Sequence, residues 1–271
     1  MRQKHYIENV LIQYNLQNKK NLQTPIQPNT QLVTDNNLLE DEHTFMSRIL
    51  YMNIVGFLQY IADCTQPDIV FITSQLVKYL KCPTMLHYNT IVYYIHYLKG
   101  TKDKWLLLGQ GNHNNIIGYT NTDSMIQENN KAISGYTFFL GESLISWSSK
   151  GQKLVSLSTY KVELIVLSNG IQEAIALQYL AEEILQISNT LTNIYCDNQV
   201  VIKSIEVDKT KYSTQTKYIG LQYNFVKCYV EEQLINIKYV QTDEQRVDIL
   251  TKSLHVPKIK HLINLISLVN V

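Results

Sequence analysis

Four polar positions stand where the predicted elements of this chain would expose a ligand site: Asn121, Glu163, Asp197 and Asp248. Asn121 ends an apolar strand, Glu163 lies in the first turns of a long helix, and Asp197 follows a second strand. Asp248 lies in the last helical segment. Open α/β sheets bind ligands at the carboxyl ends of strands and at helix ends. The order of elements therefore predicts that these four side chains converge.

Each carboxylate also has a purely structural explanation when it is taken alone. Glu163 near the start of a helix is stabilised by the helix dipole. Asp197 directly ahead of a helix is a good N-cap residue. Asp248 has no distinguishing feature of its own. Only the set, in this order of elements, favours a functional site.

A stretch from residue 116 to residue 147 predicts the sheet that would position these side chains. Three segments have the composition of antiparallel strands: Ile116–Thr122, Ser134–Leu140 and Leu144–Trp147. A polar loop (residues 123–133) and the turn Gly141–Ser143 separate them, so consecutive strands can pair as hairpins. This pattern predicts a three-stranded meander.

Helices and strands alternate after the meander. We expect, in order, a polar turn over 148–153, a long helix over 159–187, a strand over 192–195, a helix from 197, a loop over 208–216, a helix over 219–231, a strand over 234–240 and a final helix from 245. Gly170 inside the long helix costs about 1 kcal/mol relative to Ala, which indicates a close packing contact or tolerated drift. The order predicts an α/β fold with a mixed five-stranded sheet and flanking helices.

The first part of the chain predicts a small helical unit. Helices are expected over 3–16, 44–64, 69–81 and 85–98, with an extended connector over 18–41 and a short strand over 105–108. Pro67 and Pro83 mark helix boundaries, because proline is excluded from helix interiors. Gly100 is expected to end its helix. We place the domain boundary near residue 112, which gives domains 1–111 and 112–271.

Composition restricts the classes of function. The 271 residues, 45% of them hydrophobic, suffice for two domains, and a net charge of +1 does not by itself indicate a polyanionic partner. The four cysteines are widely spaced, which predicts neither a zinc site nor a disulfide framework. There is no secretory signal pattern and no run of about 18 apolar residues. We therefore expect a soluble intracellular protein, cytoplasmic or nuclear, with no membrane partner. No motif indicates an oligomeric state.

Short motifs in both halves resemble one family. In the second half they are Gly118–Asp123, Ser134–Gly141, Ile145–Lys150, Leu157–Ser158, Cys196–Gln199 and Val247–Lys252. In the first half they are Thr24–Ile26, Val55–Tyr60, Thr65–Ile69, Pro83–His87 and Tyr97–Thr101. In this order they resemble the C-terminal part of Ty1/copia-type retrotransposon Pol polyproteins. That part comprises a reverse transcriptase connection region and a ribonuclease H domain, and the resemblance covers nearly the whole chain.

The resemblance implies a ribonuclease H-like fold, preceded by a segment like a reverse transcriptase thumb or connection. It also implies hydrolysis of the RNA strand of RNA–DNA hybrids with two Mg²⁺ or Mn²⁺ ions. Such catalysis needs several carboxylates at one point, and Mg²⁺ prefers hard oxygen ligands. By position, the family's Asp, Glu, Asp, Asp set falls on Asn121, Glu163, Asp197 and Asp248. The three acidic residues are therefore the implied catalytic and metal-binding residues.

Asn121 departs from the aspartate of the family. A neutral amide offers one oxygen and no net charge, so we expect metal affinity and reaction rate to fall severely. Asp123 is the candidate substitute, because residues two apart on a strand share a face. It would lie about 6.6 Å further along the strand, at a rise of about 3.3 Å per residue.

Two functions remain open at this point. The first is a ribonuclease H-like domain with lost or weak catalysis, and the second is a non-catalytic module of the same fold that binds nucleic acid or protein. The second would use retained lysines: Lys150, Lys153, Lys203, Lys217 and Lys252. Salt-dependent binding separates the two. The chain has no Tyr-x-Asp-Asp polymerase motif, so an upstream reverse transcriptase region is an expected partner. An integrase or transposase is disfavoured, because Glu163 precedes Asp197.

Overall fold

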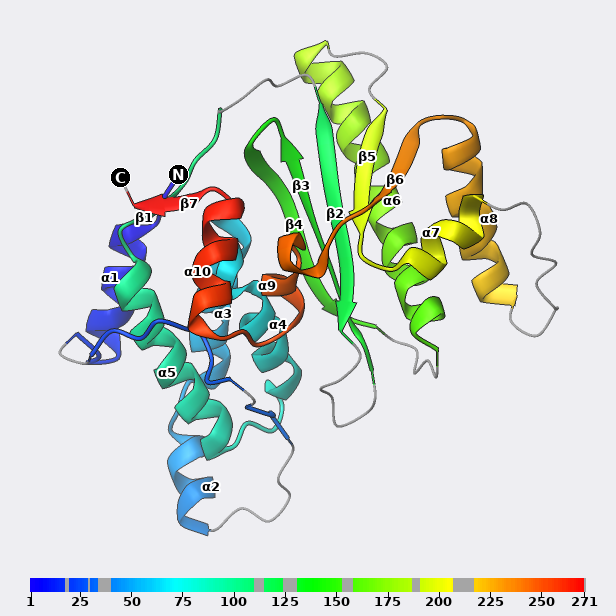
Figure 1. The fold of residues 1–271 in the computed structure, drawn as a ribbon. Coiled ribbons are helices and arrows are strands. Elements are labelled where there is room, and N and C mark those ends of the chain that lie inside the picture. Colours follow the sequence, from blue (N-terminus) through cyan, green and yellow to red (C-terminus); the bar gives the residue numbers. More distant parts are fainter. Residues whose placement is uncertain are drawn as a thin grey trace. The chain divides into compact units, whose positions relative to one another are not determined.

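The chain forms two compact units, which are described separately (Figure 1). The computed structural model describes residues 1–17, 20–28, 30–33, 40–109, 115–123, 131–152, 158–186, 191–206 and 217–270. Unit 1 comprises Met1–Leu107 and Lys252–Val271, and unit 2 comprises Leu108–Thr251. Residues 252–271 thus lie outside the unit in which the sequence placed them.

A short two-stranded sheet explains why the C-terminal residues join unit 1. Strand β1 (Lys104–Leu106) pairs antiparallel with β7 (Leu268–Asn270). The Leu107 N–H also donates to the Ser267 carbonyl oxygen over 3.0 Å. A three-residue strand is too short to carry a periodic pattern, so β7 was not expected from the sequence.

Unit 1 is helical. Its helices are α1 (Lys4–Gln13), α2 (Glu40–Ser47), α3 (Tyr51–Cys64), η1 (Pro67–Ile69), α4 (Val70–Leu76), η2 (Val77–Tyr79), α5 (Met85–Thr101) and α10 (Val256–Leu265). The helix expected over 44–64 is divided, because Leu50 has non-helical angles (φ −79°, ψ 60°). Gly100 is the next-to-last residue of α5, so the helix ends within one residue of the predicted position. A Cβ there would lie 3.3 Å from Asn21 Cβ, so the glycine allows the connector to pass close to the helix.

Unit 2 contains the mixed sheet. Its strands are β2 (Ile116–Asp123), β3 (Ile133–Leu140), β4 (Ser143–Gly151), β5 (Thr192–Cys196) and β6 (Ile235–Tyr239). The spatial order is β4-β3-β2-β5-β6 (Figure 1). The β2–β3 and β3–β4 pairs are antiparallel, whereas β2–β5 and β5–β6 are parallel. This topology confirms the five-stranded, ribonuclease H-like α/β fold class.

Strand β4 is longer than the sequence indicated. The predicted turn over 148–153 is extended strand as far as Gly151, with Lys150 opposite Ser134 and Gly151 opposite Ile133. Lys153 lies outside the described residues. Because β4 is at the edge of the sheet, its polar side chains can face water without leaving the strand. Polarity here therefore marks an edge rather than a turn.

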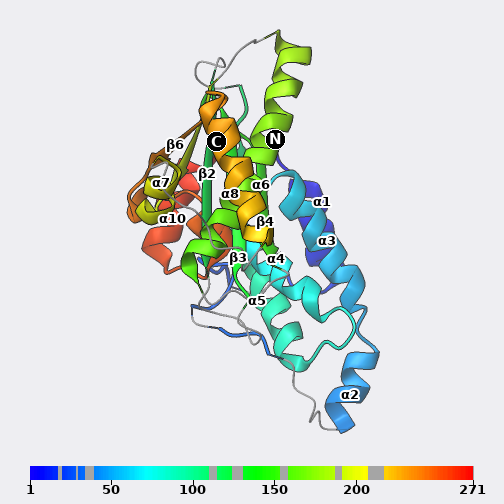
Figure 2. The same ribbon diagram turned by 90° about the vertical axis from the view of Figure 1, so that its right-hand side faces the viewer.

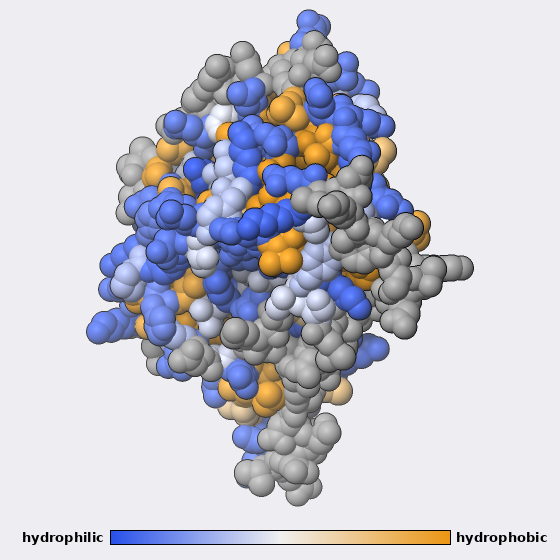
Figure 3. All heavy atoms as spheres, turned by 45° about the vertical axis from the view of Figure 1, so that its right-hand side comes forward, coloured by the Kyte–Doolittle hydropathy of each residue, from blue (hydrophilic) through white to orange (hydrophobic). Residues whose placement is uncertain are grey.

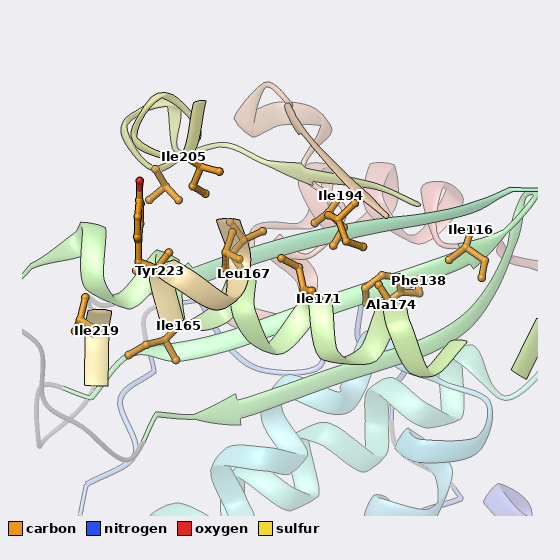
Figure 4. Packing of buried hydrophobic residues seen from close by; sticks show 14 of the residues in the cluster. Ile116, Phe138, Ile165, Leu167, Ile171, Ala174, Ile194, Ile205, Ile219 and Tyr223 are labelled. Atoms are coloured by element: carbon orange, nitrogen blue, oxygen red, sulfur yellow. The ribbon is translucent and has the colours of Figure 1, made fainter. Parts of the chain in front are cut away.

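Two helices pack against one face of the sheet, with a shared core. The helices of unit 2 are α6 (Thr159–Leu185), α7 (Gln199–Glu206), α8 (Lys217–Glu231), η3 (Thr242–Glu244) and α9 (Asp248–Thr251). Figure 2 shows α6 and α8 side by side on the sheet. Leu167 and Ile171 of α6 point toward Ile194 of β5, and Phe138 of β3 completes this layer (Figure 4).

Gly170 lies where α6 approaches β2. A Cβ on Gly170 would be 2.5 Å from Thr120 Cγ2, so the close packing contact predicted at this glycine is confirmed.

Helix α6 is also the one helix in the described ranges that is long and apolar enough to cross a membrane by length and composition alone. Half of its most apolar window is buried inside the structure, as in a core helix. The face in Figure 3 is mainly hydrophilic, with apolar side chains in separate patches.

The final helical segment expected near residue 245 is interrupted. It begins at Asp248 as the four-residue α9 in unit 2, and after a break continues as α10 in unit 1. Pro257 lies in the first turn of α10, where His255 is the extended N-cap residue (φ −74°, ψ 155°). Proline is tolerated in the first turn of a helix but not in its interior. A helix that contains Pro257 must therefore begin just before it.

Candidate active site

The Asn121 side chain of β2 is joined to Asp248, the first residue of α9. Asn121 Nδ2 donates a hydrogen bond to Asp248 Oδ1 over 2.7 Å, and Asn121 Oδ1 accepts one from the Thr122 N–H over 2.7 Å. A backbone N–H can only donate, so the amide oxygen must face Thr122 and the amide nitrogen must face Asp248. The two side chains are 3% and 1% exposed. Both ends of the amide are therefore engaged inside unit 2.

A glycine on β3 allows α9 to bring Asp248 this close. Gly135 is the register partner of Asn121. A Cβ on Gly135 would lie 2.7 Å from Val247 Cγ1 and 2.8 Å from Thr251 Cγ2. No L side chain fits between β3 and α9 at that spacing without a shift. The sequence motif Ser-Gly-Tyr thus serves the approach of α9.

A second group gathers on the side of α6. Ligand atoms of Glu163, Cys196 and Asp197 all lie within 4.8 Å of one another. Glu163 and Cys196 are buried, and Asp197 is half-buried. Burial, and then the nearby Glu163 carboxylate, raise the pKa of the Cys196 thiol to about 12. At neutral pH the thiol is therefore protonated, and the charge of this group comes from the two acids.

Thr122 links the two groups. Its Oγ1 donates to Glu163 Oε1 over 3.0 Å, while its N–H donates to Asn121. Tyr119 of β2 pairs with Tyr195 of the parallel strand β5, and the Asn121 and Asp197 positions each follow two residues later. These contacts thus connect Asp248 to Asn121, Asn121 to Glu163 through Thr122, and Glu163 to Asp197, near the carboxyl ends of β2 and β5.

The N-cap explanation for Asp197 fails. Asn198 Oδ1 accepts hydrogen bonds from the N–H groups of Val200 (3.0 Å) and Val201 (3.2 Å) at the start of α7. Asn198 is therefore the residue that caps this helix. Thr122, Cys196 and Asn198 were not predicted as site residues from the sequence. Strand alternation was the available signal for the first two, because it turns Thr122 and Cys196 toward α6.

Asp123 and Arg246 complete the polar surroundings. Asp123 ends β2 opposite Ile133, and among the described residues it is not a member of the cluster of Glu163, Cys196 and Asp197. Its role as a substitute carboxylate stays a prediction. The Arg246 guanidinium lies 4.9 Å from the ring centroid of Tyr119 and 4.6 Å from that of Phe139.

The donor set was tested against the pair of divalent ions that the fold class implies. Glu163 and Asp197 form an acidic group that can attract one cation. Between that group and Asp248, however, Asn121 Oδ1 already accepts the Thr122 N–H with one of its two lone pairs, and the Asn121 amide hydrogens face the carboxylate. A positively polarised NH₂ group cannot ligate a cation. The residues present therefore do not fit a bridged pair of ions.

Comparisons with known proteins place the chain in a family. No family model matches it. The retrovirus-related Pol polyprotein from transposon TNT 1-94 of Nicotiana tabacum is 31% identical over 253 residues, which are 92% of this chain and 19% of that protein. The corresponding polyprotein from transposon RE2 of Arabidopsis thaliana is 30% identical over 256 residues, 93% of this chain and 17% of that protein. The chain thus spans less than a fifth of the length of these relatives.

More distant similarities agree with these. The truncated transposon Ty1-A Gag-Pol polyprotein of Saccharomyces cerevisiae is 21% identical over 252 residues, which are 90% of this chain and 21% of that protein. Among solved structures, ribonuclease H1 of Halobacterium salinarum is 14% identical with a TM-score of 0.36, covering 51% of this chain and 94% of that one. The identities of 31% and 30% over more than nine-tenths of the chain make it a homologue of a segment of the Pol polyproteins of Ty1/copia-type retrotransposons.

Proposed function

We propose that unit 2 is a ribonuclease H-type domain of a retrotransposon Pol polyprotein whose hydrolysis of RNA–DNA hybrids is lost or severely reduced. One observation carries the proposal: the 2.7 Å hydrogen bond from Asn121 Nδ2 to Asp248 Oδ1. It occupies the junction at which an active domain needs negative charge. The ancestral activity is inferred from the family and from the convergence of Glu163, Asp197 and Asp248.

The chemistry explains the size of the expected loss. In two-metal hydrolysis the ions activate a water molecule and stabilise the leaving oxygen. Glu163 and Asp197 retain the charges for one part of such a site. At Asn121 the missing charge and the inward amide remove the other part. Loss of one preorganised electrostatic contact typically costs about 10²–10³ in rate, and we expect at least that here.

The proposed substrate and partners follow from the family. The RNA–DNA hybrid is the proposed ligand of unit 2, and the reverse transcriptase region of the same polyprotein is its proposed partner. Mg²⁺ or Mn²⁺ is the proposed cofactor, bound weakly through Glu163 and Asp197. We propose an intracellular location, in the cytoplasm or the nucleus, where replication intermediates of a retrotransposon occur.

The decisive experiment is divalent-metal-dependent cleavage of a labelled RNA–DNA hybrid. The native chain is compared with Asn121→Asp, and with Asn121→Asp/Glu163→Gln as the control that removes a retained acid. Cleavage by Asn121→Asp alone supports the proposal. Cleavage by the native chain contradicts it and makes Asp123 the ligand to test by Asp123→Asn. If folded Asn121→Asp also fails to cleave, the loss extends beyond position 121 and the binding role below becomes the surviving function.

A non-catalytic binding module on the same fold is the second candidate function. The hydrogen bond between Asn121 and Asp248 also favours it, because the bond holds the site together without cations. Lys150 is exposed at the end of the edge strand β4 and Lys203 is exposed on α7. If these lysines contact phosphates, Lys150→Gln lowers the salt dependence of hybrid binding by about one counterion, a slope change of roughly 0.7–0.9. Lys78→Gln in unit 1 is the matched control.

A further inference from the structure

We propose that the Asn121 amide is a metal-independent tie between β2 and α9, which holds Asp248 in place without a divalent cation. The inference rests on the proposed function in one respect, since the family relationship makes a carboxylate the expected side chain at this position. It concerns stability rather than hydrolysis. Asn121 is here a positioning residue that acts through Asp248.

Helix α9 depends on contacts of this kind. It has only four residues, Asp248–Thr251, and a single turn has almost no stability of its own. Contacts that anchor it within unit 2 include the packing on Gly135, the hydrogen bond from Gln245 Nε2 to the Thr120 carbonyl oxygen (3.1 Å) and the bond from Asn121. The bond from Asn121 reaches a carboxylate.

The direction of this hydrogen bond determines how much it stabilises unit 2. Asp248 is 1% exposed, and a buried carboxylate is costly unless donors compensate its charge. The Asn121 amide supplies such a donor over 2.7 Å, and a bond of this type is about twice as strong as one between neutral groups. The Thr122 N–H holds the amide in the donating orientation. The amide hydrogens thus offset the negative charge of the Asp248 carboxylate, as a cation between two carboxylates would.

A carboxylate in place of the amide would reverse the effect. Two carboxylate oxygens at this distance repel each other unless a proton or a cation lies between them. Other ionisable groups on or next to the elements that carry the pair are Asp123 after Asn121 on β2, Glu163 of α6, which Thr122 joins to Asn121, Asp197 beside Glu163, and Arg246 ahead of α9. Three of these four are acidic, and Arg246 is stacked on the rings of Tyr119 and Phe139. A second carboxylate therefore makes unit 2 dependent on metal.

The test compares four full-length chains in EDTA and in millimolar Mg²⁺: native, Asn121→Asp, the exchange variant Asn121→Asp/Asp248→Asn, and Asn169→Asp. The exchange variant moves the amide to the other side and keeps one donor and one carboxylate. Asn169 is exposed on α6 and controls for added negative charge. Thermal unfolding measures global stability, and hydrogen exchange of the α9 amides measures the local effect.

We expect Mg²⁺ to stabilise the native chain and Asn169→Asp only slightly and to the same extent, because any binding through Glu163 and Asp197 is weak. Asn121→Asp is expected to unfold about 10 °C lower in EDTA, with faster exchange in α9, and to recover when Mg²⁺ is added. The exchange variant is expected to recover in EDTA without Mg²⁺.

Three results would overturn the tie: a native chain stabilised by Mg²⁺ as strongly as Asn121→Asp, an Asn121→Asp chain as stable as the native one in EDTA, or a failure of the exchange variant to recover. If Asn121→Asp is unfolded in EDTA, a folded exchange variant supports the proposal and an unfolded one refutes it. The stability test and the cleavage test of the proposed function can fail independently of each other. Hybrid cleavage by the native chain would contradict that function and leave the stability comparison unchanged.

Discussion

The contact between Gly170 and Thr120 allows a quantitative test of how α6 is positioned. A Cβ on Gly170 would lie 2.5 Å from Thr120 Cγ2, whereas ordinary contacts begin at 3.4 Å, so Gly170→Ala requires a shift of about 0.9 Å. Overpacking of this kind costs about 1–3 kcal/mol, and alanine regains about 1 kcal/mol of helix propensity. The expected net loss in the free energy of unfolding is about 1 kcal/mol. At an unhindered glycine inside a helix, the same change to alanine would raise the free energy of unfolding instead of lowering it.

A substitution at Thr120 tests whether the Thr120 methyl group causes this loss of stability. In Thr120→Ala the clashing methyl is gone, and the remaining Thr120 Cβ lies 3.9 Å from the Gly170 Cβ position, an ordinary contact. Gly170→Ala should therefore stabilise the Thr120→Ala background by about 1 kcal/mol, a coupling of roughly 2 kcal/mol between the sites. Urea unfolding of the four proteins measures it. Gly220→Ala in α8 is the control, because no atom lies within 4 Å of its Cβ position.

Stabilisation by Gly170→Ala in the native background would refute the close approach of α6 to β2. A coupling near zero would refute Thr120 Cγ2 as its cause. The result also bears on the site, because Glu163 lies two turns before Gly170 on the same helix. A helix displaced by Gly170→Ala moves the Glu163 carboxylate away from Thr122.

Three further predictions test other parts of the chain. Gly135→Ala should cost about 1–3 kcal/mol and accelerate hydrogen exchange in α9, because its Cβ position is 2.7 Å from a Val247 methyl. Tyr97→Phe should lower the stability of unit 1 by about 1–3 kcal/mol in chemical unfolding, because it removes the hydroxyl that donates to the buried Asp68 carboxylate. Cys196 should react with a thiol reagent at pH 8 only after unfolding, whereas exposed Cys82 should react in the native chain, since burial raises the Cys196 pKa to about 12.

Asp68 also predicts a pH dependence for unit 1. Burial raises the pKa of its carboxyl group above the usual value, against the opposing effect of the Tyr97 hydrogen bond. A folded pKa above the unfolded one means that stability is lost as the pH rises through the folded value. Asp68→Asn keeps an acceptor for Tyr97 and removes this loss. It is therefore expected to flatten the pH dependence of unit 1 unfolding above pH 4, and an unchanged profile would contradict the assignment.

The strands, the long helix and the convergence of the four site positions could be predicted because each depends on local pattern. Buried and half-buried residues alternate along β2 from Ile116 to Thr120, and the apolar 3.6-residue period predicts α6 as a helix, although all residues from Val162 to Ser168 are buried. The remaining features depend on contacts distant in sequence. Gly135 approaches Val247 across more than a hundred residues, and β7 acquires its strand conformation only by pairing with β1. No periodicity in the sequence records such partners.

Asp197 shows how a local rule can give the wrong role. An acidic residue ahead of a helix is a good N-cap, yet the adjacent Asn198 accepts the two backbone hydrogen bonds. The cap and the site therefore use neighbouring residues for different purposes. Sequence alone could not divide these roles, because both side chains are suitable caps. Tyr195, which pairs with Tyr119, fixes the register that turns Asp197 to the site.

The arrangement of the acids does not by itself require catalysis. Gly170 sets the distance of Glu163 from β2, and Gly135 sets the distance of Asp248 from β3; both depend on backbone packing. Asn121 then joins the two sides through Thr122 and Asp248. A site held by packing and neutral donors keeps its geometry when its cations are gone. The acids at positions 163, 197 and 248 can therefore persist without catalysis, and the charge at position 121 is the difference that we propose between an active and an inactive domain.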